Sequence, residues 1–159
     1  TLEYEFPGTP RTVGTTLKVT WHDGGRKPDL ALARMPEGKT LPSGGSLVIG
    51  EGGAMVLPHV GKPILLPEQD YQGYVMPKLE PVNHWHSFVE AVRGNGKTSA
   101  NFDYAGPLTE TILLGGIASR FPQTTLEWDA KALAFKNVKE ANQFVKRTYR
   151  KGWEVKGLS

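Results

Sequence analysis

The sequence predicts an α+β, two-layer fold, in which an open, mostly antiparallel or mixed sheet has helices packed on one face. Three observations support this. Segments with the two-residue alternation of strands occupy the first half of the chain, and segments with helical spacing occupy the second half. Glycine-rich turns join the strand segments, as in hairpins. Strands that precede the helices, rather than alternating with them, are typical of antiparallel sheets covered on one side.

The first predicted hairpin spans residues 2–21 and buries one face, because apolar residues alternate with polar ones in both strands. Its alternating apolar residues are Leu2, Tyr4, Phe6, Leu17, Val19 and Trp21. A second hairpin is predicted from residues 46–49 and 54–57, with Gly50, Gly52 and Gly53 supplying the positive φ angles of a tight turn.

Two irregular segments flank the second hairpin. Residues 26–45 have no sustained period, so we expect a loop that lies over a surface. Residues 58–81 carry five prolines and are predicted to be mostly extended connection, although residues 64–66 can pair briefly at a sheet edge.

Three helices are predicted in the second half. The first runs from about Asn83, its N-cap, to Arg93, before Gly94. The second has Pro107 near its first turn and extends to Phe121. Because it is apolar around most of its circumference, we expect it to be the buried central helix.

Two further patterns concern these helices and the end of the chain. Gly115 and Gly116 in the second helix indicate close approach of another backbone, such as the sheet beneath it. After a short strand at 126–128, Asn137 and Glu140 form a pattern like a capping box, which predicts a last helix with an inner stripe extending to Tyr149.

Composition restricts the class of protein. A chain of 159 residues with 38% hydrophobic and 22% charged residues fits one soluble globular domain. No apolar run approaches the roughly 20 residues that cross a bilayer, so no membrane partner is expected. The chain has no cysteine, which excludes disulfides, thiolate nucleophiles and cysteine-ligated zinc. Because it opens at Thr1 directly in a strand pattern, without a signal peptide, we expect it to be cut from a longer protein.

The formal charge of +3 does not predict nucleic-acid binding, because the basic residues are scattered. The densest cations lie where the last helix is expected to end, and cations there complement the helix dipole. These cations are Lys146, Arg147, Arg150 and Lys151.

Three motifs are interpreted as structural. Residues 91–98 match a relaxed phosphate-loop pattern, but they overlap a helix end and lack the preceding strand. His84 and His86 stand two residues apart, so on a helix their rings point to different sides and do not converge on a metal. The glycines at 50–53 lack the spacing and the following helix of a dinucleotide site.

The candidate substrate-binding residues are Trp21, His22 and Asp23 at a strand end, and Asp103 and Tyr104 before the central helix. Aromatic faces and hydrogen-bonding groups suit sugar-like ligands. A core tryptophan beside an ordinary Asp-Gly turn explains the first group as well. In the second group, Asp103 either accepts a ligand hydroxyl or caps the helix.

Several runs in their linked order resemble a known family: residues 83–94 (NHWHSFVEAVRG), 101–110 (NFDYAGPLTE), 126–129 (LEWD), 149–154 (YRKGWE), and 19–25 (VTWHDGG). They resemble the C-terminal region of bacterial glucose-fructose oxidoreductase, inositol dehydrogenase and MocA (Gfo/Idh/MocA) proteins. The resemblance spans nearly the whole chain. It implies an oxidoreductase with an N-terminal Rossmann domain for NAD or NADP and a C-terminal open sheet for substrate support and subunit association.

That resemblance assigns residues 1–159 to a single C-terminal domain whose Rossmann partner lies outside it. It implies a sugar or polyol substrate, a bacterial source, cytoplasmic or exported, and homo-oligomers formed through the sheet face. No cofactor is expected on this chain, and no family catalytic residue or metal ligand can be placed on its numbers. The alternative is a non-catalytic binding or dimerisation module derived from that family.

Overall fold

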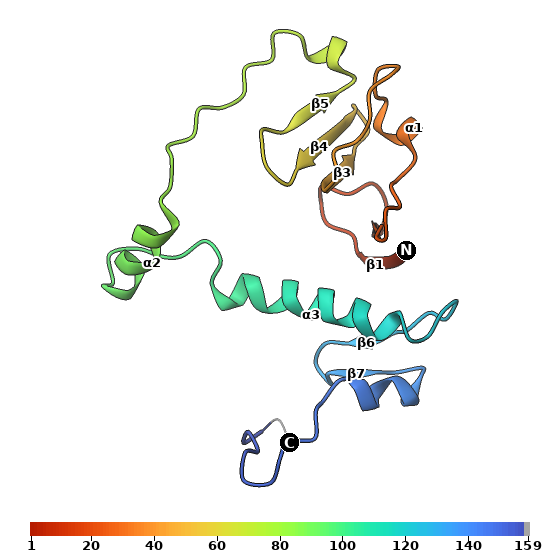
Figure 1. Ribbon diagram of the computed structural model, residues 1–159, viewed down its shortest axis with the longest axis vertical. Coiled ribbons are helices and arrows are strands. Elements are labelled where there is room, and N and C mark those ends of the chain that lie inside the picture. The colour runs from red at the N-terminus through yellow and green to blue at the C-terminus, as the bar shows by residue number, and fades with distance from the viewer. Residues whose placement is uncertain (158–159) are drawn as a thin grey trace. The chain divides into compact units, whose positions relative to one another are not determined.

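The computed structural model describes residues 1–157 of the chain. Helices and strands are both present, which confirms the α+β class, and the strands of residues 1–157 form three small sheets (Figure 1). The chain divides into two compact units, the first ending at Pro81 and the second beginning at Val82.

Unit 1 contains two sheets, and both predicted hairpins are present. The first sheet pairs β1 with β2, and the second has the order β3-β4-β5 with antiparallel neighbours (Figure 1). The strands are β1 (Leu2–Pro7), β2 (Thr16–Trp21), β3 (Gly45–Ile49), β4 (Ala54–Pro58) and β5 (Ile64–Leu66). The register places Val56 of β4 opposite Leu47 on one side and Ile64 on the other. The predicted edge pairing of residues 64–66 is therefore confirmed.

The turn between β3 and β4 uses its glycines differently from the prediction. The backbone N–H of Gly50 donates to the carbonyl of Gly53 at 2.8 Å. None of Gly50, Gly52 and Gly53 has a positive φ, so that expectation is wrong. Gly53 is required for space instead, because a Cβ there would collide with the carbonyl oxygen of Leu66 on β5.

The core of unit 1 includes residues of the segment that was predicted to be a surface loop. A short helix, α1 (Leu30–Ala33), begins where the side chain of Asp29 accepts a hydrogen bond from the N–H of Ala31 at 2.9 Å. The buried cluster consists of Ala33, Leu41, Ala54, Val56 and Leu66. Residues 26–45 therefore contribute to the core rather than only lying over it, and their helix is too short to show a period in the sequence.

Unit 2 begins with the predicted first helix and continues into a long second one. Its elements are α2 (His84–Val92), α3 (Phe102–Ala118), β6 (Trp128–Asp129), β7 (Ala134–Phe135) and the 3₁₀ helix η2 (Lys139–Phe144). The side chain of Asn83 caps α2, and Gly94 follows the helix with φ +82°. The second helix starts earlier than predicted, because Asn101 caps it and Pro107 lies inside it.

The core of unit 2 lies between the end of α3 and the β6–β7 hairpin. Its buried members are Ile117, Phe135 and Ala141. The rings of Trp128 and Phe135 meet edge to face, with their centroids 5.0 Å apart. The side chain of Asn142 accepts from the N–H of Phe135 at 2.7 Å and donates to its carbonyl at 3.1 Å, as a neighbouring strand would.

The predicted last helix is wrong in its cap and its length. The amide of Asn137 accepts from the N–H of Glu127 at 2.9 Å and donates to the carbonyl of Thr125 at 2.8 Å. It therefore binds the backbone just before β6 instead of capping a helix. The helical residues form only η2, which ends at Phe144 and therefore does not reach Tyr149.

Candidate functional site

Trp21, His22 and Asp23 lie together where β2 ends. Trp21 is 48% exposed, His22 is half-buried and Asp23 is exposed. The Oδ1 atom of Asp23 accepts from the N–H of Gly24 at 2.7 Å, and Gly24 and Gly25 have φ values of +65° and +80°. The Asp-Gly turn is therefore formed. The indole of Trp21 and the second carboxylate oxygen of Asp23 stay accessible to a ligand.

Asp103 and Tyr104 lie in the first turn of α3, in unit 2. The Oδ1 atom of Asn101 accepts from the N–H of Tyr104 at 3.2 Å. The cap is thus Asn101, and the alternative in which Asp103 caps the helix is wrong. The exposed carboxylate of Asp103 still complements the positive end of the helix dipole. These two residues and the Trp21 group belong to different units.

An apolar groove runs along α3, and the sequence prediction missed it. It has a volume of about 470 Å³ and lies between α3, the β6–β7 hairpin and the residues after η2. Small residues, Ala105, Gly106 and Thr109, line it between the larger Phe102 and Leu113. These α3 residues are spaced so that they share one helix face, and this spacing was the signal of the groove that the sequence offered.

Polar groups border the α3 groove at two places. The indole Nε1 of Trp128 donates to Oε1 of Glu110 at 2.7 Å, which fixes the ring that forms one wall. The exposed ammonium of Lys146 stands at the groove as well. The groove therefore offers an apolar surface with one carboxylate and one cation.

A smaller hollow of about 220 Å³ lies beside β5 in unit 1. The rings of Tyr71 and Tyr74 line it edge to face, with their centroids 6.5 Å apart. Glu68, also in its lining, forms an ion pair with Lys39 at 2.6 Å. Neither hollow includes the strand-end residue Trp21.

The apolar side of the β1–β2 hairpin is largely uncovered, so the predicted burial of this face is wrong for β2. In β1, Tyr4 and Phe6 are half-buried and their rings stack at 6.1 Å, and partial burial raises the pKa of Tyr4. In β2, Leu17 and Val19 are each 42% exposed.

The central helix α3 is also exposed rather than buried. Among the described residues of α3, only Gly115 and Ile117 are buried, whereas Tyr104 and Leu113 are 62% and 64% exposed. A Cβ added at Gly116 would meet no atom within 4 Å. The predicted close approach of another backbone is therefore not found at Gly116 among residues 1–157.

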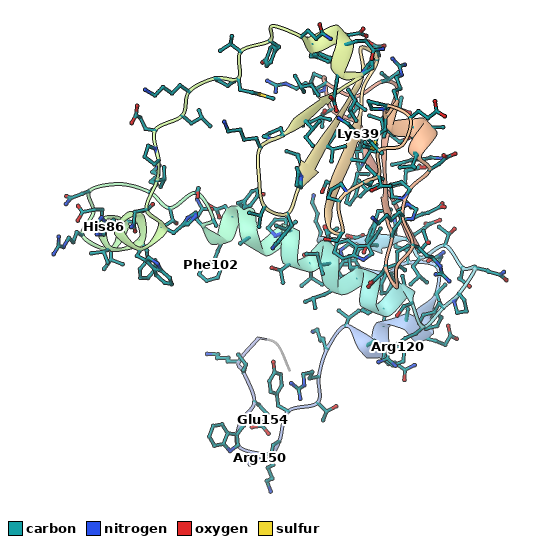
Figure 2. All side chains as sticks on the ribbon, turned by 45° about the horizontal axis from the view of Figure 1, so that its top comes forward. Lys39, His86, Phe102, Arg120, Arg150 and Glu154 are labelled. Atoms are coloured by element: carbon teal, nitrogen blue, oxygen red, sulfur yellow. The ribbon has the colours of Figure 1, made fainter. Side chains whose placement is uncertain are left out.

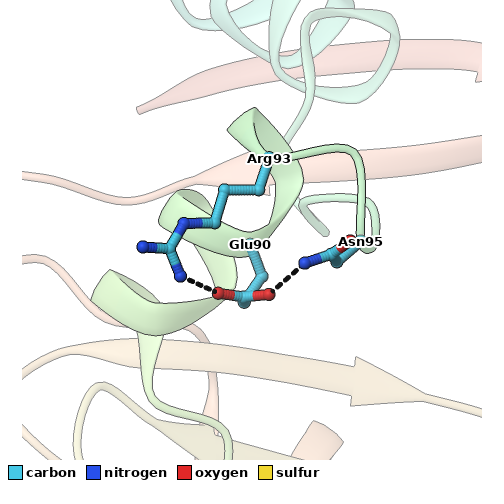
Figure 3. A network of polar contacts seen from close by, with 3 residues as sticks. All are labelled: Glu90, Arg93 and Asn95. Atoms are coloured by element: carbon cyan, nitrogen blue, oxygen red, sulfur yellow. Dashed lines mark hydrogen bonds and ion pairs between the residues drawn. The ribbon is translucent and has the colours of Figure 1, made fainter.

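The phosphate-loop match has the structure of a helix end, as predicted. α2 stops at Val92, and the carboxylate of Glu90 binds Arg93 at 3.1 Å and the amide of Asn95 at 2.8 Å. Figure 3 shows this network closing the turn that follows the helix. The backbone N–H of Asn95 bonds to the carbonyl of Glu90, so it is not free to cradle a phosphate.

Within residues 1–157, no group of three or more histidine, cysteine or acidic side chains is arranged to hold a metal ion, and His84 and His86 belong to no such group. The same residues contain no helix with the length and apolar character needed to cross a membrane. No protein-family model, curated protein or solved structure matches this chain.

Proposed function

We propose that this chain is the substrate-supporting and subunit-associating domain of an NAD(P)-dependent oxidoreductase that acts on a sugar or polyol. The observation that carries the proposal is that each unit has an uncovered apolar surface, the β1–β2 face in unit 1 and α3 in unit 2, and that the Trp21–Asp23 turn at the end of β2 is accessible. The resemblance of the sequence runs to the Gfo/Idh/MocA C-terminal region supports the same reading.

Surface area supports the need for further protein contacts. The chain exposes 13669 Å². Two compact units of half its mass would together expose about 9,500 Å². The excess of about 4,000 Å² on one chain is larger than the roughly 1,000–2,500 Å² that each partner buries in most obligate interfaces.

A nicotinamide dinucleotide does not fit the described residues. Such a cofactor takes a parallel strand–helix–strand unit with a glycine-rich turn at the helix N-terminus. In this chain, short connections without helices join the paired strands, and the β3–β4–β5 and β6–β7 sheets are antiparallel. Under the proposal, the cofactor therefore belongs to a separate nucleotide-binding domain.

The residues of this chain contribute at the substrate end. The half-exposed indole of Trp21 provides an apolar face for the C–H groups of a sugar ring. Asp23 retains one carboxylate oxygen that can accept from a substrate hydroxyl, and the preceding residue, the half-buried His22, adds an imidazole ring. Asp103 and Tyr104 offer a carboxylate and a phenol on the other unit.

Ligand-observed NMR with a panel of hexoses and inositols tests this proposal on the full chain. We expect binding that Trp21→Ala abolishes and that Trp85→Ala, a change at an 80% exposed tryptophan of α2, leaves intact. The chain alone is expected to show neither turnover nor tight NAD(P) binding. Dehydrogenase turnover by the chain alone, or equal loss of binding in both variants, would contradict the proposal.

The uncovered β2 face also favours the second candidate, a dimerisation module. Leu17, Val19 and Trp21 are exposed apolar residues that a second copy can match across a two-fold axis. Sedimentation should then show a dimer that Val19→Glu dissociates. Val13→Glu changes a 73% exposed residue in the β1–β2 connection and serves as control. A monomer of the unmodified chain at high concentration would exclude this candidate.

A further inference from the structure

The positive charge of the chain is concentrated near its C-terminal end. Residues 146–156, which we name the C-terminal strap, contain five cations and one carboxylate, a net +4. Because the whole chain carries +3, the remaining residues sum to −1. The cations of the strap are Lys146, Arg147, Arg150, Lys151 and Lys156.

The structure removes the helix-dipole explanation for these cations. The last helical element, η2, ends at Phe144, and the strap that follows contains turns but no helix. All five cations are exposed, and none forms an ion pair within residues 1–157. Within the described residues, no direct ion pair therefore offsets their mutual repulsion.

The strap also holds a preformed turn that presents an aromatic ring. The N–H of Trp153 donates to the carbonyl of Arg150 at 2.9 Å, and Gly152 adopts φ +85°. The carboxylate of Glu154 accepts from the N–H of Gly152 at 2.8 Å. Arg150 and Glu154 lie on this turn (Figure 2). The guanidinium of Arg150 stands 4.7 Å from the ring centroid of Trp153, which is 67% exposed.

We propose that the C-terminal strap docks on an acidic surface of a partner protein, with the Arg150–Trp153 pair as its anchor. Tryptophan and arginine are enriched among the residues that dominate protein–protein binding energy. A turn that is already formed loses less conformational freedom on binding. The surrounding lysines match an acidic partner and speed its association.

The same geometry disfavours single-stranded nucleic acid as the partner. Proteins that bind such strands stack successive bases on several aromatic side chains. In the strap, Trp153 is the only exposed aromatic residue, because Tyr149 is half-buried, and the Trp153 ring is already partnered by Arg150. The pair forms one mixed apolar and cationic surface, which fits a single pocket lined by carboxylates.

The test measures fluorescence anisotropy of a labelled synthetic peptide of repeated Glu-Glu-Leu units with the full chain. We expect binding that weakens as salt increases and that falls about 30-fold in Trp153→Ala, the loss typical of an interface anchor. Trp85→Ala is the matched tryptophan control and should bind as the unmodified chain does. Hydrogen exchange outside the strap verifies that each variant is folded.

Charge reversal separates a local site from net charge. Lys146→Glu with Lys151→Glu should abolish peptide binding, whereas Lys62→Glu with Lys78→Glu, which makes the same change in net charge at exposed positions of unit 1, should retain it. Equal losses in the two double variants would overturn the proposal. So would tighter binding of an oligothymidylate than of the peptide, or no peptide binding at low salt.

Discussion

The side chain of Asn142 acts as a substitute strand for the short β6–β7 hairpin, and removing it tests how unit 2 is held together. Its amide makes two hydrogen bonds to the backbone of Phe135, at 2.7 Å and 3.1 Å, and Phe135 is only 4% exposed. Each such bond contributes about 1 kcal/mol net. We therefore expect Asn142→Ala to lower the free energy of unfolding of unit 2 by about 2 kcal/mol.

Two measurements check this prediction. The denaturant midpoint of unit 2, followed by tryptophan fluorescence, should fall, and the amide of Phe135 should exchange with solvent about 30-fold faster, the factor that corresponds to about 2 kcal/mol. Gln143→Ala is the control, because the Gln143 side chain bonds only to an exposed carbonyl of its own turn. An unchanged midpoint together with unchanged exchange at Phe135 would refute the role assigned to Asn142.

Three further predictions concern unit 2. Phe135→Ala should lower the free energy of unfolding by about 3–5 kcal/mol, since it empties the buried cluster; an equal denaturant midpoint would disprove that packing. Gly116→Ala should raise thermal stability by about 1 kcal/mol, because its Cβ meets open space on an exposed helix face, and a loss of stability would reveal a close contact there. Hydrogen bonds from the N–H groups of Ala132 and Lys131 lower the pKa of Asp129. The ionised carboxylate therefore stabilises the folded state above the ordinary carboxyl pKa, and this contribution is lost as the pH falls through the lowered pKa. Denaturation midpoints measured against pH should show this loss at acid pH in the unmodified chain and not in Asp129→Asn. Identical pH profiles of the two proteins would exclude a stabilising role of Asp129.

Local chemistry made several elements predictable. Alternation at Leu2, Tyr4 and Phe6 defined β1, because successive strand side chains point to opposite faces. Asn83 marked the start of α2, because its short side chain reaches the free N–H groups of the first helical turn. Gly94 marked its end, because a positive φ favours glycine.

The candidate site was predictable only in part. The strand-end position of Trp21, His22 and Asp23 follows from the alternation and the two glycines, and the structure places them on one turn. The α3 groove depends on how Trp128 is held by Glu110, residues that are 18 positions apart. The α3 side of the groove has a helical spacing, but a contact over that separation has no local pattern, so the sequence prediction missed the groove.

The sequence by itself determined the α+β class, the hairpins and the first helix, because each depends on neighbours within a few residues. Only the tertiary structure decided that Asn142 binds the backbone of β7 and Asn137 the backbone just before β6, that the last helix stops at Phe144, and that α3 is exposed. Hydrogen-bond competition and burial are set by groups distant in the chain. The side-chain oxygen of Asn137 can accept from any free backbone N–H group. In the folded chain its donor is the N–H of Glu127 and not an N–H of the helix that follows.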